Sequence, residues 1–324
     1  MCNSDATDES YMRRCIQLAR NGRQHAAPNP MVGAVIVHDG RVIGEGFHAV
    51  CGQAHAEVNA INSVRPADRP LLRESTLYVS LEPCAHFGRT PPCAALIVKT
   101  GIPRVVVGCI DPFAKVQGRG VEMLRKAGVE VVTGVLEDEC RRLNRRFFTA
   151  QTRRRPYVTL KWARSADGFI DKWRDTADKP PVRLSTPFSL MQVHRLRSRH
   201  QAILVGHRTL QLDRPQLNVR HWAGEQPLRV ALGRVAEDEL PAGFLAYDGI
   251  ETALEALARQ GVQSLLVEGG RETLQGFIDK GLWDEAWVEL SPCALGSGVP
   301  EPRMPVSARL SVERRFGSVF LHYE

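Results

Sequence analysis

The sequence lacks the features that would place it outside ordinary globular proteins. No apolar run approaches the ~20 residues needed to cross a bilayer, so no membrane partner is expected. The first ten residues are polar and acidic and hold no apolar signal core, which predicts a cytoplasmic protein. Hydrophobic residues make up 43% of the 324 residues and charged residues 24%, which excludes disorder as the main state. Neither an internal repeat nor a low-complexity tract is present.

Aromatic residues are scarce, at 6%, and positive charge is not concentrated. The net charge of +7 divides into +4 for residues 1–150 and +3 for residues 151–324. A protein that binds nucleic acid usually gathers basic and aromatic side chains on one face. We therefore expect no nucleic-acid partner, while the mild basicity suits a phosphorylated small molecule.

A disulfide framework is not expected either. Eight cysteines in a chain of this length, without a secretory signal, predict reduced thiols that are mostly buried. Two of them, Cys84 and Cys93, belong to a pattern that needs another explanation.

Strand and helix signals alternate along both halves of the chain; they include a hairpin across the turn dipeptide Asp39-Gly40, a strand over residues 76–81 and a helix over residues 136–148. This alternation predicts an α/β protein with largely parallel sheets. The length corresponds to about two domains. A basic stretch that ends in Pro156 follows a predicted helix and is a plausible linker. The sequence thus predicts one domain over residues 1–152 and a second over residues 153–324.

The first half carries a pattern typical of a catalytic zinc site. His55 and Glu57 stand at the start of a predicted helix, Cys84 follows a predicted strand, and Cys93 opens the next helix. One imidazole and two thiolates leave one open position on a tetrahedral zinc ion, where water is activated. Glu57 is then placed to move a proton rather than to bind metal, as in the zinc nucleobase deaminases. Taken alone, a histidine or a cysteine pair is more often part of a core.

The spacing departs from the usual deaminase signature. Eight residues separate Cys84 from Cys93, where the signature has two. The intervening loop is stiffened by two prolines, and its Arg89 and Thr90 are suited to bind an anion.

Four groups of residues resemble the RibD family of bifunctional riboflavin-biosynthesis enzymes. They are Pro28-Asn29-Pro30, His55-Ala56-Glu57, Glu82-Pro83-Cys84 with Gly88-Arg89-Thr90-Pro91-Pro92-Cys93, and Asp111-Pro112 with Gly118-Arg119-Gly120. The resemblance implies a cytidine-deaminase-like α/β/α sandwich followed by a dihydrofolate-reductase-like α/β domain.

For the first domain, the resemblance implies deamination of 2,5-diamino-6-ribosylamino-4(3H)-pyrimidinone 5′-phosphate. His55, Cys84 and Cys93 would hold Zn²⁺, and Glu57 would be the catalytic proton shuttle. Asn29 and Arg89 would contact this phosphorylated pyrimidine. A turn residue between two prolines is the alternative reading of Asn29.

In the second half, the strongest local signal is Glu268-Gly269-Gly270, where a strand ends and a helix begins. Free N–H groups at such a helix start bind phosphate, but the pattern is not the dinucleotide-binding fingerprint. The resemblance implies an NADPH-dependent reductase that converts the ribosylamino group to ribitylamino. It places cofactor contacts at Thr209, Asp213, Gly270, Arg271, Glu272 and Thr273, and substrate contacts at Lys161, Leu217, Arg220 and Glu268. Lys161 and Asp213 are candidates for polarising or protonating the sugar.

Three positions depart from the family pattern. Pro181 and Arg183 stand where many members have serine and tryptophan, and Arg164 replaces a small residue beside the cofactor. These departures keep open the alternative of a deaminase whose reductase-like domain is only structural. A second alternative, a nucleic-acid base deaminase with an appended binding domain, is disfavoured by the low aromatic content and the dispersed charge. The resemblance also implies a homo-oligomer, either a dimer or a tetramer.

Overall fold

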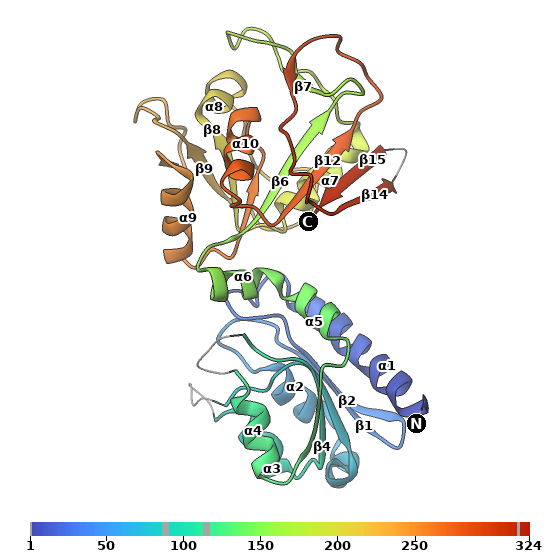
Figure 1. Cartoon of the computed structure of the whole chain (residues 1–324). Coiled ribbons are helices and arrows are strands. Elements are labelled where there is room, and N and C mark those ends of the chain that lie inside the picture. Colours follow the sequence, from blue (N-terminus) through green and yellow to red (C-terminus); the bar gives the residue numbers. More distant parts are fainter. Residues whose placement is uncertain (1, 86–90, 113–116, 316–317) are drawn as a thin grey trace. The chain divides into compact units, whose positions relative to one another are not determined.

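The computed structural model of the chain describes residues 2–85, 91–112, 117–315 and 318–324 (Figure 1). The chain forms two compact units, Met1–Arg153 and Arg154–Glu324. The division falls one residue after the boundary expected from the basic linker. In the described part of the chain, no helix has the length and apolar character needed to span a membrane.

A five-stranded mixed sheet forms the centre of the first unit, in the order β2-β1-β3-β4-β5. Strands β3, β4 and β5 are parallel, whereas β1 is antiparallel to both β2 and β3. The predicted hairpin forms at Asp39 and Gly40, which both adopt positive φ. The strands are β1 (Gly33–His38), β2 (Arg41–Phe47), β3 (Thr76–Leu81), β4 (Arg104–Cys109) and β5 (Glu130–Thr133).

Helices cover both faces of this sheet (Figure 1). On one face, α2 (Ala56–Ser63), α3 (Cys93–Thr100) and α4 (Arg119–Lys126) share a buried core with the strands. On the other face lie α1 (Cys2–Ala19), α5 (Glu137–Leu143) and α6 (Arg145–Arg153). Two 3₁₀ turns, Arg20–Gly22 and Pro66–Glu74, join these elements. The expected α/β/α sandwich is therefore present.

One helix predicted from the sequence is divided in the structure. The signal over residues 136–148 corresponds to α5 and α6, which meet at Asn144. The Asn144 side chain accepts a hydrogen bond from Met31 N–H and donates one to the Met31 carbonyl, each at 2.8 Å. This tertiary contact ties the helix junction to the segment before β1.

The second unit contains an eight-stranded sheet in the order β10-β9-β8-β11-β6-β12-β15-β14. The six strands from β10 to β12 are parallel, and β15 and β14 complete the sheet antiparallel. The strands are β6 (Tyr157–Arg164), β8 (Ala202–Gly206), β9 (Leu228–Leu232), β10 (Phe244–Tyr247), β11 (Ser264–Val267), β12 (Glu285–Leu290), β14 (Leu310–Arg315) and β15 (Ser318–Tyr323). A separate ribbon pairs β7 (Phe169–Asp171) with β13 (Val299–Pro300).

Four helices pack on this larger sheet in the described residues. Helices α9 (Ile250–Arg259) and α10 (Arg271–Asp279) share one core with the strands. Residues of α7 (Pro187–Arg197) and α8 (His207–Asp213) join a second core on other side chains of the same strands. The short helix α8 and the strands β7, β10 and β14 were not expected from sequence periodicity.

Candidate functional site

The first unit brings His55, Cys84 and Cys93 together, although they are far apart in the sequence. The Nδ1 atom of His55 lies 3.6 Å from Cys84 Sγ and 3.4 Å from Cys93 Sγ. All three donor atoms lie within 4.8 Å of one another. On a tetrahedral zinc ion, bond lengths of ~2.1 Å to nitrogen and ~2.3 Å to sulfur place the two atoms about 3.6 Å apart. The donor set and its spacing therefore fit zinc.

Backbone contacts position the two thiols. Cys93 is the first residue of α3, and its N–H donates to Cys84 Sγ at 3.2 Å, while the N–H of Ala94 donates to the Cys84 carbonyl at 3.2 Å. A hydrogen bond between the thiols lowers the pKa of Cys84 to about 4, an effect that His55 reinforces, and raises the pKa of Cys93. The site thus stabilises a thiolate at Cys84, the form that binds metal.

A buried carboxylate anchors the segment between β3 and Cys84. Glu82 is 5% exposed. Its two carboxylate oxygens accept four hydrogen bonds from the N–H groups of Asp111, Gly118, Gly120 and Val121, at 2.9–3.3 Å. Glu82 therefore links the strand that leads to the cysteine with the start of α4.

Glu57 lies in the first turn of α2, two residues after His55, and is 3% exposed. Burial raises the pKa of Glu57 to about 7, and the nearby negative charge of Cys84 acts in the same direction. A carboxyl group with such a pKa can accept and release a proton near neutral pH.

A second layer connects Asn29 to this cluster through His48. Asn29 Nδ2 lies 3.2 Å from His48 Nε2, and His48 Nδ1 lies 3.1 Å from the Ala54 carbonyl. His48 therefore donates from Nδ1 and accepts from Asn29 at Nε2. Its ring meets the His55 ring edge-on, with centroids 5.3 Å apart. Asn29 is thus linked to the cluster through His48, and its contact with substrate stays a prediction. Arg89, the other substrate contact expected in this unit, is outside the described residues.

The second unit contains a cavity of about 680 Å³. It follows the carboxyl ends of the parallel strands β6, β11, β8 and β9, where open α/β sheets bind ligands. Eight of the residues predicted for this domain line it: Lys161, Thr209, Asp213, Glu268, Gly270, Arg271, Glu272 and Thr273.

Two glycines allow the start of α10 to approach β8 closely. A Cβ atom on Gly206 would lie 2.2 Å from Thr273 Oγ1, and one on Gly269 would lie 2.9 Å from Thr273 Cβ. The N–H of Gly270 donates to Thr209 Oγ1 at 3.0 Å, which joins the first turns of α8 and α10. The segment from Gly270 to Thr273, which we call the cradle, thus lies against β8 and α8, and N–H groups at such a helix start are of the kind that bind phosphate.

Glu268 forms a largely buried ion pair with Arg197, in which 10–11% of each side chain is exposed. Its carboxylate accepts two hydrogen bonds from Arg197, at 2.7 and 3.0 Å. Burial alone would raise the pKa of Glu268, but Arg197 outweighs burial and holds the pKa below its usual value. Lys161 adds a smaller effect of the same sign. The pair therefore presents a fixed polar wall beside Lys161.

Two predicted substrate contacts lie elsewhere. Leu217 is 1% exposed and packs in the core on the α8 side of the sheet. Arg220 is exposed, and its guanidinium donates to Asn218 Oδ1 at 2.9 Å. Contacts of these two side chains with substrate stay predictions.

The residues that depart from the family pattern have distinct places. Pro181 and Arg183 line the cavity. Arg164 forms an ion pair with Glu301 at 3.2 Å.

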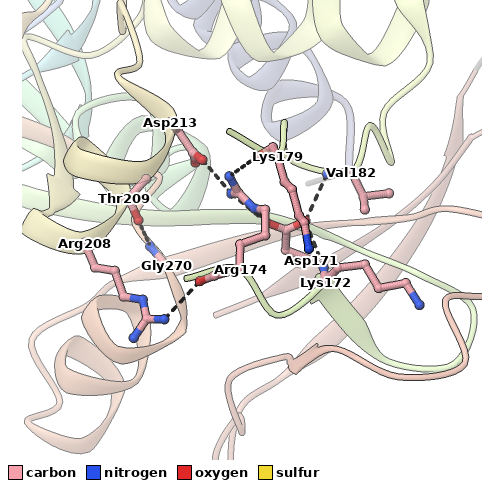
Figure 2. Close-up of polar contacts among 9 residues, drawn as sticks. All are labelled: Asp171, Lys172, Arg174, Lys179, Val182, Arg208, Thr209, Asp213 and Gly270. Atoms are coloured by element: carbon pink, nitrogen blue, oxygen red, sulfur yellow. Dashed lines mark hydrogen bonds and ion pairs between the residues drawn. The ribbon is translucent and has the colours of Figure 1, made fainter. Parts of the chain in front are cut away.

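Asp213 lies at the cavity, and its Oδ1 accepts a hydrogen bond from Arg174 at 2.5 Å (Figure 2).

The sequence does not indicate His48, Glu82, Arg174 and Arg197 as parts of the two sites, although Glu82 belongs to the Glu82-Pro83-Cys84 motif. A lone histidine or arginine carries no spacing signal. Their roles come from partners between 19 and 71 residues away in the chain.

Comparisons with known proteins match both units of the chain. Residues 5–109 match the cytidine and deoxycytidylate deaminase zinc-binding region, and residues 156–309 match the RibD C-terminal domain. The riboflavin biosynthesis protein RibD of Aquifex aeolicus is 38% identical over 90% of this chain and 89% of its own length. RibD of Escherichia coli is 32% identical over the same shares.

A solved structure covers nearly the whole molecule. The Thermotoga maritima diaminohydroxyphosphoribosylaminopyrimidine deaminase/5-amino-6-(5-phosphoribosylamino)uracil reductase aligns with a TM-score of 0.87 and 35% identity, over 99% of both chains. The predicted resemblance and fold class are confirmed. With its zinc-binding deaminase region and its dihydrofolate-reductase-like second unit, the chain belongs to the RibD family of bifunctional deaminase/reductases of riboflavin biosynthesis.

Proposed function

We propose that the two units catalyse consecutive steps on one phosphorylated pyrimidine. The first unit deaminates 2,5-diamino-6-ribosylamino-4(3H)-pyrimidinone 5′-phosphate, and the second uses NADPH to reduce the ribosyl side chain of the product. The observation that carries this proposal is the cluster of His55, Cys84 and Cys93 beside the buried Glu57. The alignment with the Thermotoga maritima protein covers 99% of both chains, and the deaminase and reductase activities in the name of that protein support the choice of substrate.

In the deaminase unit, His55, Cys84 and Cys93 would hold zinc. The ion supplies a Lewis acid that activates water at neutral pH. Glu57 takes a proton from the attacking water and delivers it to the departing amine, so water replaces the amino group and ammonia leaves. Its near-neutral pKa suits both transfers. Asn29 orients the site through His48.

In the reductase unit, NADPH supplies the hydride for the sugar C1′. The cradle at Thr209 and residues 270–273 suits its phosphates. As the bond between C1′ and the ring oxygen breaks, that oxygen takes up a proton, and Lys161 is the candidate donor at the cavity wall. Glu268, held by Arg197, accepts hydrogen bonds from substrate hydroxyl groups.

The test uses the purified full chain with the diaminopyrimidinone phosphate, with and without NADPH. We expect about one zinc ion per chain, ammonia release without NADPH, and NADPH oxidation only after deamination. Glu57→Gln removes ammonia release and retains zinc, whereas Glu74→Gln, at an exposed position, changes neither. Zinc-loaded protein that releases no ammonia from this substrate would refute the deaminase proposal.

NADPH binding separates an active reductase from a domain that is only structural. The match to the RibD C-terminal domain over residues 156–309 favours the active form. A fluorescence titration of the full chain with NADPH measures this binding directly. Assembly into a dimer or tetramer stays a prediction, which light scattering of the purified protein checks.

A further inference from the structure

A loop over residues 172–182 forms part of the wall of the large cavity. Asp171, the last residue of β7, holds both ends of this loop. Its Oδ1 accepts hydrogen bonds from the N–H groups of Lys172 and Val182, each at 2.9 Å (Figure 2). The loop is therefore closed on itself at one carboxylate.

The side chain of Arg174 turns inward from this loop and is buried, with 8% of the residue exposed. Its Nε donates to Asp171 Oδ2 at 2.8 Å, and its Nη1 donates to the Lys179 carbonyl at 3.0 Å. Its Nη2 donates to Asp213 Oδ1 at 2.5 Å. Figure 2 shows the guanidinium between the two carboxylates. A planar guanidinium with three fixed partners has little freedom to turn.

Asp213 occupies an unfavourable position for a carboxylate. It is the last residue of α8, where the carbonyl groups create a partial negative charge. Arg174 compensates for this repulsion. Among the described residues, Oδ1 has Arg174 as its partner while Oδ2 has none, and the Asp213 side chain is 24% exposed. The free oxygen is thus available to a ligand in the cavity.

We propose that Arg174 is a positioning residue of the reductase site, which orients the Asp213 carboxylate toward hydrogen-bond donors of the nicotinamide nucleotide. This inference rests on the proposed use of NADPH. A carboxylate accepts hydrogen bonds, so its partners on the nucleotide are sugar hydroxyl or carboxamide N–H groups. Arg174 acts through Asp213, because its Nε, Nη1 and Nη2 atoms each already donate to a partner in the protein.

The test is a double-mutant cycle on NADPH binding, measured by fluorescence titration of the full chain. Asp213→Asn removes the carboxylate charge, and Arg174→Gln removes the group that orients it. Each change weakens binding about tenfold, the worth of one charge-assisted hydrogen bond. Because Arg174 acts through Asp213, the double variant is also weakened about tenfold, not a hundredfold. Arg174→Lys, which keeps the charge, recovers part of the affinity.

The control is Arg259→Gln, which removes an exposed arginine that pairs with Glu255 on α9. It leaves NADPH affinity unchanged. Deamination and thermal unfolding of each variant show that the chain is folded. If Arg174→Gln does not fold, Arg174→Lys is measured in the wild-type and Asp213→Asn backgrounds instead.

Two results overturn the inference. One is an equal loss of affinity from Arg174 substitution with and without Asp213, because the arginine would then act on its own. The other is wild-type affinity in both Arg174 variants. Failure of the wild-type protein to bind NADPH would instead refute the proposed reductase function.

Discussion

Glu82→Gln tests whether one buried carboxylate organises the zinc site. The amide group of glutamine can replace only one of the two carboxylate oxygens. Four backbone N–H groups donate to Glu82, two to each oxygen. In the variant, two of these N–H groups would face the NH₂ group of glutamine and would lose their acceptor. A buried donor without a partner costs ~1–3 kcal/mol, so the first unit loses about 2–6 kcal/mol of stability.

The loss of stability affects the zinc site directly, because Cys84 follows Glu82 by only two residues in the chain. The start of α4 moves as well, since a Cβ at Gly120 would lie 1.9 Å from the Pro83 carbonyl and the two segments are in close contact. We expect a lower thermal transition of the first unit, less zinc per chain and slower ammonia release. NADPH binding by the second unit stays unchanged.

The assay follows thermal unfolding, zinc content and NADPH affinity of the same preparations. Glu74→Gln is the matched control, because Glu74 is exposed. A Glu82→Gln protein with wild-type stability and full zinc content would show that the four hydrogen bonds do not organise the site.

Three further predictions address the two units separately. Gly206→Ala places a methyl group 2.2 Å from Thr273 Oγ1, so we expect weaker NADPH binding with normal deamination; wild-type affinity in this variant would contradict the steric argument. Burial lowers the pKa of His194 to about 4, below its unfolded value near 6.5, so folding favours the neutral ring and stability falls as the pH drops from about 6.5 toward 4. His194→Gln should flatten this decrease in denaturant unfolding at pH 7 and pH 5, and an unchanged slope would exclude His194 as its source. After a chelator removes zinc, Cys84, which is partly exposed, should react with a thiol reagent faster than Cys93, which is 2% exposed. Mass spectrometry measures the labelling of each cysteine. Equal labelling with and without chelator would contradict metal ligation.

Much of the fold was predictable because hydrophobic periodicity is local. The hairpin at Asp39-Gly40 and the strand before Cys84 were predicted to within about two residues, the usual error at element ends. The first sheet proved mixed rather than largely parallel, since the order of strands depends on long-range pairing. Helix α8 could not be predicted from the sequence, because its seven residues are too few to show a helical period.

The metal cluster was predictable because its three ligands stand at element boundaries, where motifs carry spacing information. The reductase site was harder to predict from the sequence. Leu217 carries a motif match, yet its side chain lies in the core, and Glu268 proved to be paired with Arg197. A motif names residue types, whereas burial and ion pairing depend on every element that packs around them.

The sequence by itself determined the donor set at His55, Cys84 and Cys93 and the alternation that produces two α/β units, because both depend on residues close to their own strand or helix. Only the tertiary structure decided which distant groups meet: the His48 ring contacts His55, Glu82 accepts hydrogen bonds from the start of α4, and Arg174 donates to Asp213. The physical reason is that charge and hydrogen bonding act over a few ångströms of space, whereas a sequence orders residues only along the chain.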